Sequence, residues 1–231
     1  TKKLWYYQLN VKRNLGKTDI KLTSIGFGGA PLGNLFEELN ETHCFDIVKS
    51  CFENNINLYD TSPLYGYGLS EHRIGNFIKT IDPKTYYLST KVGRYLTPER
   101  NYYKDGKFKG HINFIPHFDY SYDGVMRSFD QSIHRLAVPE IDICLIHDVD
   151  RYTFGNEVDH YFKIAMNGAY KALNDLKEQK VIKAIGVGLN DADICARFAN
   201  EGDFDCMLLA GRYTLLDLSL IHISEPTRLD D

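Results

Sequence analysis

The sequence has little of what marks several large classes of protein. No stretch of its 231 residues approaches the apolar length that spans a bilayer, and the first residues lack the apolar core of a signal peptide. A formal net charge of −4 and a pI near 6.1 give no electrostatic attraction to nucleic acid or to an anionic membrane. We therefore expect neither a nucleic-acid partner nor a membrane partner.

Cysteine is scarce, and its spacing forms no motif. The five cysteines include no Cys-x-x-Cys pair, and their odd number in helix-like and strand-like contexts indicates reduced, buried thiols. This usage predicts a cytoplasmic location. Asn40 begins a glycosylation sequon, but we interpret it as the N-cap of the helix that follows.

What the chain does have is a regular alternation of strand-like and helix-like segments. Up to about residue 22, alternating polar and apolar residues with a turn at 14–17 predict a hairpin or an N-terminal plug. Short apolar runs predict strands at 24–30, 56–59, 86–91, 141–147, 181–188 and 205–210. Helical spacing of apolar residues predicts helices at 41–54, 70–79, 122–136, 156–179 and 192–199. Strands that are apolar on both faces and alternate with helices are typical of an α/β fold with a parallel sheet.

Ionisable side chains stand at the carboxyl ends of three of these strands. Asp60 follows the second strand, and Tyr65 lies in the Gly-rich loop after it. Lys91 and His147 end the third and fourth strands. Because the carboxyl ends of parallel strands face the ligand crevice, we expect these four side chains to meet in one pocket.

A long insertion, residues 93–120, follows the end of the third strand and shows no clear period. Long loops in compact domains are usually functional, so we place it over the pocket. Its aromatic residues Tyr102, Tyr103, Phe114 and Phe118 either line the substrate cleft or anchor the loop, and we favour the second interpretation.

The four strand-end side chains suit proton transfer that accompanies hydride transfer. A phenol has an ordinary pKa near 10, which a nearby ammonium lowers. Tyr65 beside Lys91, itself paired with Asp60, is thus a candidate proton donor and acceptor for a carbonyl/alcohol couple. A neutral His147 can hydrogen-bond the same oxygen. Since the set contains no nucleophile and no metal, the hydride must come from a cofactor.

His147 with Asp148 and Asp150 also admits a metal site as an alternative. Metal-dependent hydrolases built as a barrel of alternating strands and helices usually carry two histidines on the first strand, and residues 25–30 contain none. We therefore predict no metal.

The Gly-rich first strand is not a dinucleotide fingerprint. Gly26, Gly28 and Gly29 fail that pattern because Pro31 stands where the helix should begin. We predict that these glycines instead allow a ligand to approach the mouth of the barrel closely. Asn190, after the fifth strand, is either a helix N-cap or a cofactor ligand.

These motifs resemble the aldo-keto reductase family over nearly the whole chain before Leu218. Asp60, Tyr65 in Asp–Thr–Ser–Pro–Leu–Tyr–Gly, Lys91 in Ser–Thr–Lys–Val–Gly and His147 in Leu–Ile–His–Asp match the family's catalytic tetrad in type, order and spacing. The resemblance implies a (β/α)8 TIM barrel and NAD or NADP as cofactor. It implies that Tyr65 is the general acid/base, tuned by Lys91 and Asp60, and that His147 orients the carbonyl.

Within the family, four stretches most resemble the aldose and fucose 1-dehydrogenase subgroup, which includes pyridoxal dehydrogenases. They are residues 28–33, 70–71, 146–151 and 210–216. This implies oxidation of a sugar hemiacetal at its anomeric carbon to a lactone, with NAD(P)⁺ accepting the hydride. The resemblance also makes Gly28, Gly29 and Asn190 candidates for cofactor binding, Asn190 only if the register of the family's Ser–Asn pair shifts by one. The choice between NAD and NADP and the oligomeric state stay open.

We expect residues 1–217 to form a partial barrel with about six of the eight β/α units, and residues 218–231, which resemble translated sequencing adapter, to be a non-native tail. In that family, the aromatic residue that stacks on the nicotinamide and most of the residues that bind the adenosine phosphate belong to the two remaining units. Two alternatives stay open. One is a non-catalytic nucleotide-sensing barrel. The other is an inactive fragment whose outer strands are exposed edges.

Overall fold

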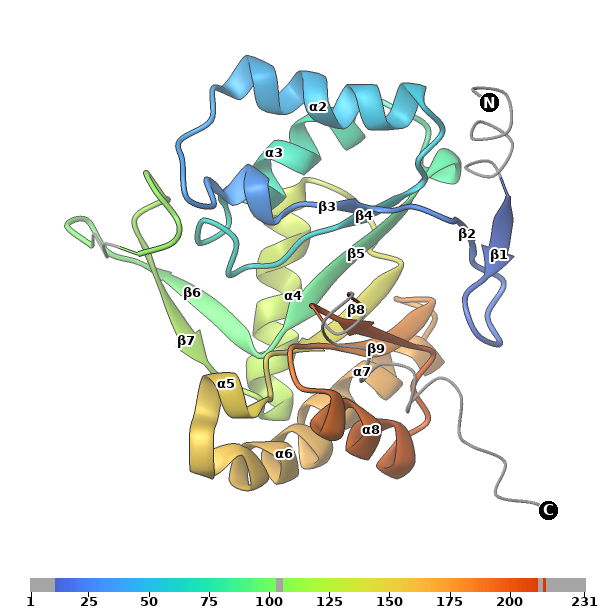
Figure 1. The fold of residues 1–231 in the computed structure, drawn as a ribbon, viewed down its shortest axis with the longest axis vertical. Helices are drawn as coiled ribbons and strands as arrows, with labels where there is room; N and C mark the ends of the chain where they lie inside the picture. The colour runs from blue at the N-terminus through green and yellow to red at the C-terminus, as the bar shows by residue number, and fades with distance from the viewer. Residues whose placement is uncertain (1–10, 103–105, 212–213, 215–231) are drawn as a thin grey trace.

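The computed structural model describes residues 11–102, 106–211 and 214, and within them the chain forms one central parallel sheet with helices packed outside it (Figure 1). The sheet has six strands in the order β10–β9–β8–β5–β4–β3. They are β3 (Phe27–Gly28), β4 (Leu58–Asp60), β5 (Tyr87–Val92), β8 (Ile143–His147), β9 (Ala184–Leu189) and β10 (Cys206–Leu209). Each strand pairs in parallel with the next along the chain, as in an incomplete (β/α)8 barrel, so the predicted fold class is confirmed.

The helices follow the strands in alternation. They are α2 (Glu41–Glu53), α3 (Leu69–Ile78), α4 (Tyr122–Leu136), α5 (Arg151–Phe154), α6 (Val158–Asn167), α7 (Ala169–Glu178) and α8 (Ala192–Glu201), with short 3₁₀ turns η1 (Ala30–Gly33), η2 (Pro83–Thr85) and η3 (Gly155–Glu157). The Asn40 side chain caps α2 by accepting the backbone N–H groups of Thr42 at 2.9 Å and His43 at 3.4 Å. The prediction of an N-cap at this position is confirmed.

The single long helix predicted over residues 156–179 was wrong. The segment starts with η3 and then forms two helices, α6 and α7, which separate at Gly168. A Cβ at Gly168 would collide with the backbone oxygen of Tyr120. The break therefore accompanies a close contact with a distant segment, and apolar periodicity within the helices carries no sign of it.

The insertion after β5 contains more regular structure than its sequence indicated. Strands β6 (Arg94–Pro98) and β7 (Phe114–Phe118) form an antiparallel hairpin that projects from the central sheet (Figure 1). Near the N-terminus, β1 (Lys12–Asn14) and β2 (Lys21–Thr23) form the expected hairpin. Leu15 and Leu22 of that hairpin pack against the inner side of the sheet, which agrees with the predicted plug.

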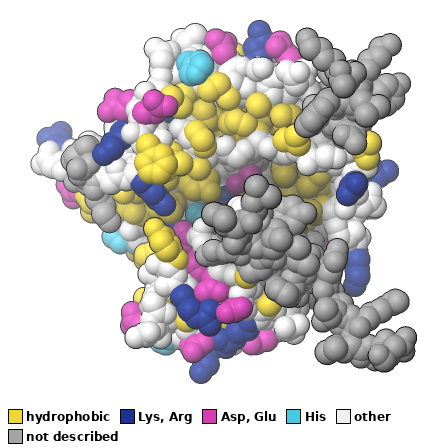
Figure 2. Space-filling view, in the orientation of Figure 1, with side chains coloured by type: hydrophobic (Ala, Val, Ile, Leu, Met, Phe, Trp, Pro, Cys, Tyr) yellow, Lys and Arg dark blue, Asp and Glu magenta, His cyan; other side chains and the backbone are white. Residues whose placement is uncertain are grey.

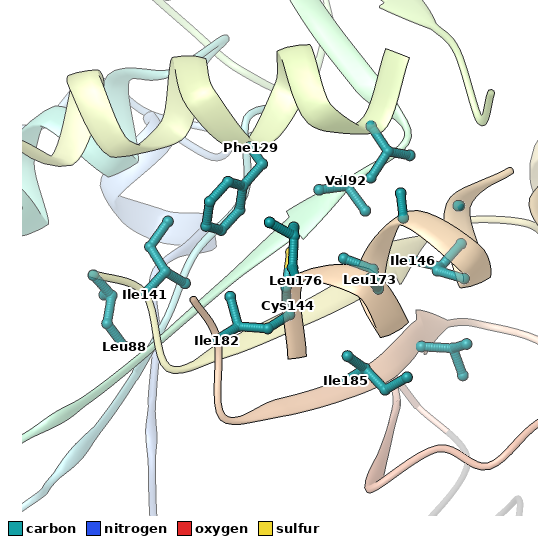
Figure 3. Close-up of a cluster of buried hydrophobic side chains, with 14 of the residues drawn as sticks. Leu88, Val92, Phe129, Ile141, Cys144, Ile146, Leu173, Leu176, Ile182 and Ile185 are labelled. Atoms are coloured by element: carbon teal, nitrogen blue, oxygen red, sulfur yellow. The ribbon is translucent and has the colours of Figure 1, made fainter. Parts of the chain in front are cut away.

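The main hydrophobic core lies between the sheet and its outer helices. Figure 3 shows Phe129 of α4 and Leu173 and Leu176 of α7 facing Cys144 and Ile146 of β8, and all of these side chains are buried. The five cysteines are unpaired. In the described ranges no helix is both long and apolar enough to cross a membrane.

Candidate active site

The carboxyl ends of β4, β5 and β8 bring the four predicted side chains together. Lys91 Nζ lies 2.6 Å from Asp60 Oδ2 and donates a second hydrogen bond to the carbonyl of Thr61 at 2.7 Å. The same ammonium is 4.8 Å from the centre of the Tyr65 ring. The Tyr65 and His147 rings meet edge to face, with centroids 6.0 Å apart. Asp60, Tyr65, Lys91 and His147 therefore share one site, as their strand positions predicted.

The loop from β4 to α3 is folded so that Tyr65 is held over this cluster. The backbone N–H of Tyr65 donates to the Ser62 carbonyl at 3.1 Å, and its own carbonyl accepts from Ser70 at 3.1 Å. Gly66 has a positive φ of 63°, and a Cβ there would lie 2.6 Å from the Gly33 carbonyl oxygen. The turn thus requires glycine next to the phenol, which explains the Tyr–Gly pair in the sequence.

Burial decides the direction in which the pKa of Tyr65 is shifted. Removal from water raises the pKa of the phenol, the charge and hydrogen bond of Lys91 lower it, and the charge of Asp60 raises it again. The net pKa is raised. Our sequence-based expectation was right that Lys91 acts to lower the pKa of Tyr65, but wrong about the net direction of the shift. An ordinary phenol is already protonated at neutral pH, and the raised pKa keeps Tyr65 protonated, ready as a proton donor.

Lys91 keeps its charge although it is buried. Burial acts to lower the pKa of the ammonium, but Asp60 and Tyr65 outweigh this and leave the pKa raised. Asp60 is fixed in turn by Ser89, whose hydroxyl donates to Oδ1 at 2.8 Å. The pair is therefore an ion pair at neutral pH, oriented from both ends.

His147 is buried and neutral. Burial lowers the pKa of its imidazole well below 6.5, and the nearby cations Arg94 and Lys91 lower it further. Its Nδ1 lies 3.0 Å from the Ser62 hydroxyl and 3.1 Å from Arg94 Nη1, and its backbone carbonyl accepts from the Tyr120 hydroxyl at 2.6 Å. A neutral ring held in this way can orient a substrate oxygen, as the sequence suggested.

Two residues at the site were not singled out from the sequence. Arg94 opens β6 and donates to Asp148 Oδ2 at 2.8 Å as well as contacting His147. Ser62 was named only as part of the motif that contains Tyr65. Gly93 precedes Arg94 with a φ of 101°, in a position where a Cβ would collide with the Tyr120 ring. The Gly93–Arg94 pair directly after the strand could have indicated Arg94, but it was missed because residues 93–120 were treated together as an insertion without a clear period.

The three candidate cofactor residues lie in different surroundings. Gly28 pairs with Asp60 in the sheet, and a Cβ there would meet nothing within 4 Å. A Cβ at Gly29 would lie 2.7 Å from Ser70 Oγ and 2.8 Å from the Asp60 carbonyl oxygen, so α3 and the end of β4 both approach Gly29 closely. The side-chain amide of Asn190 donates to Asp148 at 3.2 Å and Asp150 at 3.0 Å. A role of these residues in cofactor binding stays a prediction.

The helix-cap alternative for Asn190 is wrong. The side chain of Asp191, one residue further on, accepts the backbone N–H groups of Asp193 and Ile194 and so caps α8. Asn190 instead bridges the two carboxylates that follow His147.

The aromatic residues of the insertion divide between anchoring and exposure. Phe108 packs on Tyr65 with centroids 6.2 Å apart, and Tyr102 and Phe114 belong to the same cluster. Phe118 is 46% exposed, with the guanidinium of Arg94 4.3 Å above its ring. Tyr103 lies outside the described residues. The described part of the insertion therefore covers Tyr65, which supports its placement over the pocket.

On the face drawn in Figure 2, hydrophobic side chains gather across the upper middle, and a group of positively and negatively charged side chains lies below, where Figure 1 places α5 and α8. Arg151 of α5 pairs with Asp191, just before α8, at 2.9 Å. A separate cavity of about 850 Å³ lies at the other ends of the strands, lined by Thr18, Lys177 and Lys183 among others. No predicted site residue lines that cavity. Among the described residues, no three His, Cys, Asp or Glu side chains converge as metal ligands would.

Comparison with known proteins places these features in a family. A family model described as the aldo/keto reductase family matches residues 24–226. The chain is 39% identical over 218 residues to the pyridoxal 4-dehydrogenase of Microbacterium luteolum, covering 89% of this chain and 63% of that protein. It is 32% identical over 203 residues to the D-threo-aldose 1-dehydrogenase of a Pseudomonas species, covering 86% and 59%. The chain thus spans about three fifths of the length of these relatives.

The fold is also that of solved structures. An aldo-keto reductase of Bacillus halodurans superposes with a TM-score of 0.63 at 24% identity, over 86% of this chain and 56% of that one. At this level of identity the likeness bears on the fold alone.

Proposed function

The chain belongs to the aldo/keto reductase family, and on that premise we propose that it is an NAD(P)-dependent oxidoreductase. It moves a hydride between the nicotinamide and the anomeric carbon of an aldose, which gives a lactone, or it acts on a related aldehyde or alcohol. The observation that carries the proposal is the cluster of Tyr65, the Asp60–Lys91 ion pair and neutral His147. Its substrate is a small molecule, and pyridoxal is the related aldehyde to include in any test.

The side chains of the cluster handle the proton and orient the oxygen. When bound, the nicotinamide supplies or accepts the hydride. In the oxidative direction the substrate hydroxyl gives its proton to the Tyr65 oxygen, and in the reductive direction Tyr65 returns it to the carbonyl oxygen. Lys91 favours the phenolate that remains, and its charge is held in place by Asp60. His147 donates a hydrogen bond to the same oxygen and fixes its direction.

The residues present fit such a cofactor chemically. The cluster contains a proton donor, a fixed cation and a neutral hydrogen-bond donor but no activated nucleophile, which is the set that hydride transfer requires from the protein. Gly28, beside Asp60 in the sheet, leaves open space at the same strand edge. Gly28 would line the approach to the cluster, and Asn190 would lie beside it just after β9, with its side-chain nitrogen held by Asp148 and Asp150.

The test measures nicotinamide absorbance with NAD⁺ and NADP⁺ against a panel of aldoses and pyridoxal. We expect turnover in the unmodified protein and a loss of about 10²–10⁴-fold in Tyr65→Phe, because that is the range contributed by positioned acid–base groups. Tyr152→Phe is the matched control, since Tyr152 is highly exposed on α5, and it should leave the rate unchanged.

Two outcomes would count against the proposal. Turnover that survives in Tyr65→Phe would remove the phenol from the chemistry. Nucleotide binding by calorimetry without turnover of any substrate would favour the nucleotide-sensing alternative.

A further inference from the structure

We infer that Arg94, held by Asp148, is a positioning residue that fixes His147 as the tautomer whose proton is on Nε2. The effect on turnover rests on the proposed function, whereas the tautomer itself does not. Arg94 and Asp148 are not among the four predicted residues, and their ion pair joins β6 to the loop after β8.

The contacts at Nδ1 decide where the ring proton lies. Arg94 Nη1 is 3.1 Å from His147 Nδ1, and a guanidinium has only N–H donors and stays charged. Nδ1 must therefore present its lone pair. The Ser62 hydroxyl, 3.0 Å from the same nitrogen, already accepts the backbone N–H of Leu64 at 3.1 Å, so its own proton is available to Nδ1. With two donors facing Nδ1, the single proton of the neutral ring is on Nε2.

The guanidinium of Arg94 is held from several sides. Its Nη2 donates to Asp148 Oδ2 at 2.8 Å, and its Cζ lies 4.3 Å from the centre of the Phe118 ring. Its backbone carbonyl accepts from the Ser128 hydroxyl of α4 at 2.6 Å. Asp148 adopts a positive φ of 54°, an uncommon conformation for a non-glycine residue, which the surrounding structure must maintain. The arginine is thus a fixed donor.

Charged groups from every neighbouring element act on the same ring. Lys91 of β5 and Lys107 of the segment between β6 and β7 add to the effect of Arg94 and burial, and all of them lower the pKa of His147. Asp148 is the opposing anion, with Oδ1 at 3.4 Å from Nε2. Burial and the three cations prevail, so the ring stays neutral over the working range of pH.

The consequence is a division of roles between the two rings. His147 offers Nε2–H as a hydrogen-bond donor and has no second proton to give, because Nδ1 is occupied by donors. Tyr65, whose ring centroid lies 6.0 Å away, is then the group that carries the proton. Loss of Arg94 would let Nδ1 take up a proton and would free the ring to adopt the other tautomer.

The test is two-bond ¹H–¹⁵N correlation NMR of the histidine rings in the uniformly labelled 231-residue chain, with His147→Asn identifying the signals. We expect an unprotonated Nδ1 and a protonated Nε2 in the unmodified chain, with no titration between about pH 5 and pH 9. In Arg94→Met the ring should titrate within this range or show both tautomers. Arg94→Lys, which keeps a charged N–H donor, should retain the original pattern.

A matched control is an arginine of α4 that packs on the same hairpin. Arg127 places its guanidinium 4.7 Å above the Tyr95 ring of β6 and is exposed, so Arg127→Met should leave the His147 signals unchanged. In turnover, Arg94→Met should lose about 10–100-fold in kcat, the range known for partners that orient metal-ligating histidines, with the KM for nucleotide unchanged.

A protonated Nδ1 in the unmodified chain would overturn the inference without any variant, even if Arg94→Met failed to fold. Unaltered His147 signals in a folded Arg94→Met would overturn it as well. If the NMR pattern is as expected and no protein turns over any substrate, the inference stands and the proposed function fails.

Discussion

Replacing Asp60 by Asn tests the buried charge pair at the centre of the site. Lys91 is 1% exposed, and its ammonium has Asp60 Oδ2 at 2.6 Å and the Thr61 carbonyl at 2.7 Å. The amide keeps the shape of the carboxyl group and removes its charge, which leaves a buried ammonium without an anion. Breaking a buried ion pair from one side costs roughly 3–5 kcal/mol.

The structure places this perturbation at the lower end of that range. The Asp60 side chain is 14% exposed, so water partly screens the charge that is lost. We expect the free energy of unfolding to fall by about 3 kcal/mol, and Tm to fall by about 6–12 °C, at about 2–4 °C per kcal/mol for a domain of this size.

The pH dependence of this loss has a defined sign. In the unmodified protein the folded-state pKa of Lys91 is raised above its ordinary 10.5, so the pair stabilises the fold below that pH, and the stabilisation is lost as pH rises through the folded-state pKa. In Asp60→Asn burial acts on Lys91 without the opposing carboxylate and should place its folded-state pKa below the unfolded value. The unfolded chain then binds more protons, and the stability of the variant rises with pH. The difference in free energy of unfolding between the unmodified protein and Asp60→Asn should therefore become smaller from pH 7 towards about pH 10.

The assay is urea-induced unfolding at several pH values across that range. Asp130→Asn is the control, since Asp130 is 74% exposed and only 3.7 Å from exposed His134, and it should change stability by no more than about 0.5 kcal/mol. The double variant Asp60→Asn/Lys91→Met should recover part of the loss, because it removes the orphaned charge. A loss below about 1 kcal/mol at neutral pH, or a gap that does not narrow with pH, would refute the description of Lys91 as a charged group in a dry pocket.

Three further predictions follow from other contacts. The initial rate of sugar oxidation, followed by nicotinamide absorbance, should keep rising to above about pH 10, because burial raises the pKa of the Tyr65 phenol that must accept the proton; a plateau near neutral pH would contradict this. Glu71→Gln should lower the free energy of unfolding by roughly 3–5 kcal/mol in urea titrations, because it leaves Arg135, whose Nε lies 2.5 Å from the buried carboxylate, without an anion. The double variant Glu71→Gln/Arg135→Met should regain part of the lost stability. Gly75→Ala should cost about 1–3 kcal/mol in the same measurement, because its Cβ would collide with the backbone at the end of α4, and an unchanged midpoint would show that the two helices can separate freely.

Local periodicity and the geometry of parallel sheets explain what the sequence could predict. The helix expected over residues 122–136 has those bounds in α4, since its apolar stripe, N-cap serine and stop are all local. Asp60, Lys91 and His147 could be assigned to one site because each lies at or next to the last residue of a strand and parallel strands end at the same edge. The same reasoning needed no knowledge of side-chain packing.

The features that the sequence did not reveal depend on contacts between distant segments. Gly168 divides α6 from α7 where the chain passes the backbone of Tyr120, and a helical pattern on either side gives no sign of that contact. The role of Arg94 depends on the turn at Gly93, which returns the chain towards His147. The net pKa of Tyr65 depends on how deeply the ring is buried, whereas the sequence indicates only which charges lie near it.

Two cations of the site, Lys91 and Arg94, are each held by a carboxylate beside a different ring. Lys91 is paired with Asp60 at 2.6 Å next to the phenol, and Arg94 is paired with Asp148 at 2.8 Å next to the imidazole. Negative charge that develops on a substrate oxygen between the two rings would therefore meet fixed positive groups and need no rearrangement of the protein. Because each cation already has a carboxylate, the site carries this potential without an unpaired buried charge. The proton that is transferred is then the one on Tyr65, so the rate of the acid–base step depends on the phenol. The imidazole of His147 fixes the orientation of the substrate oxygen.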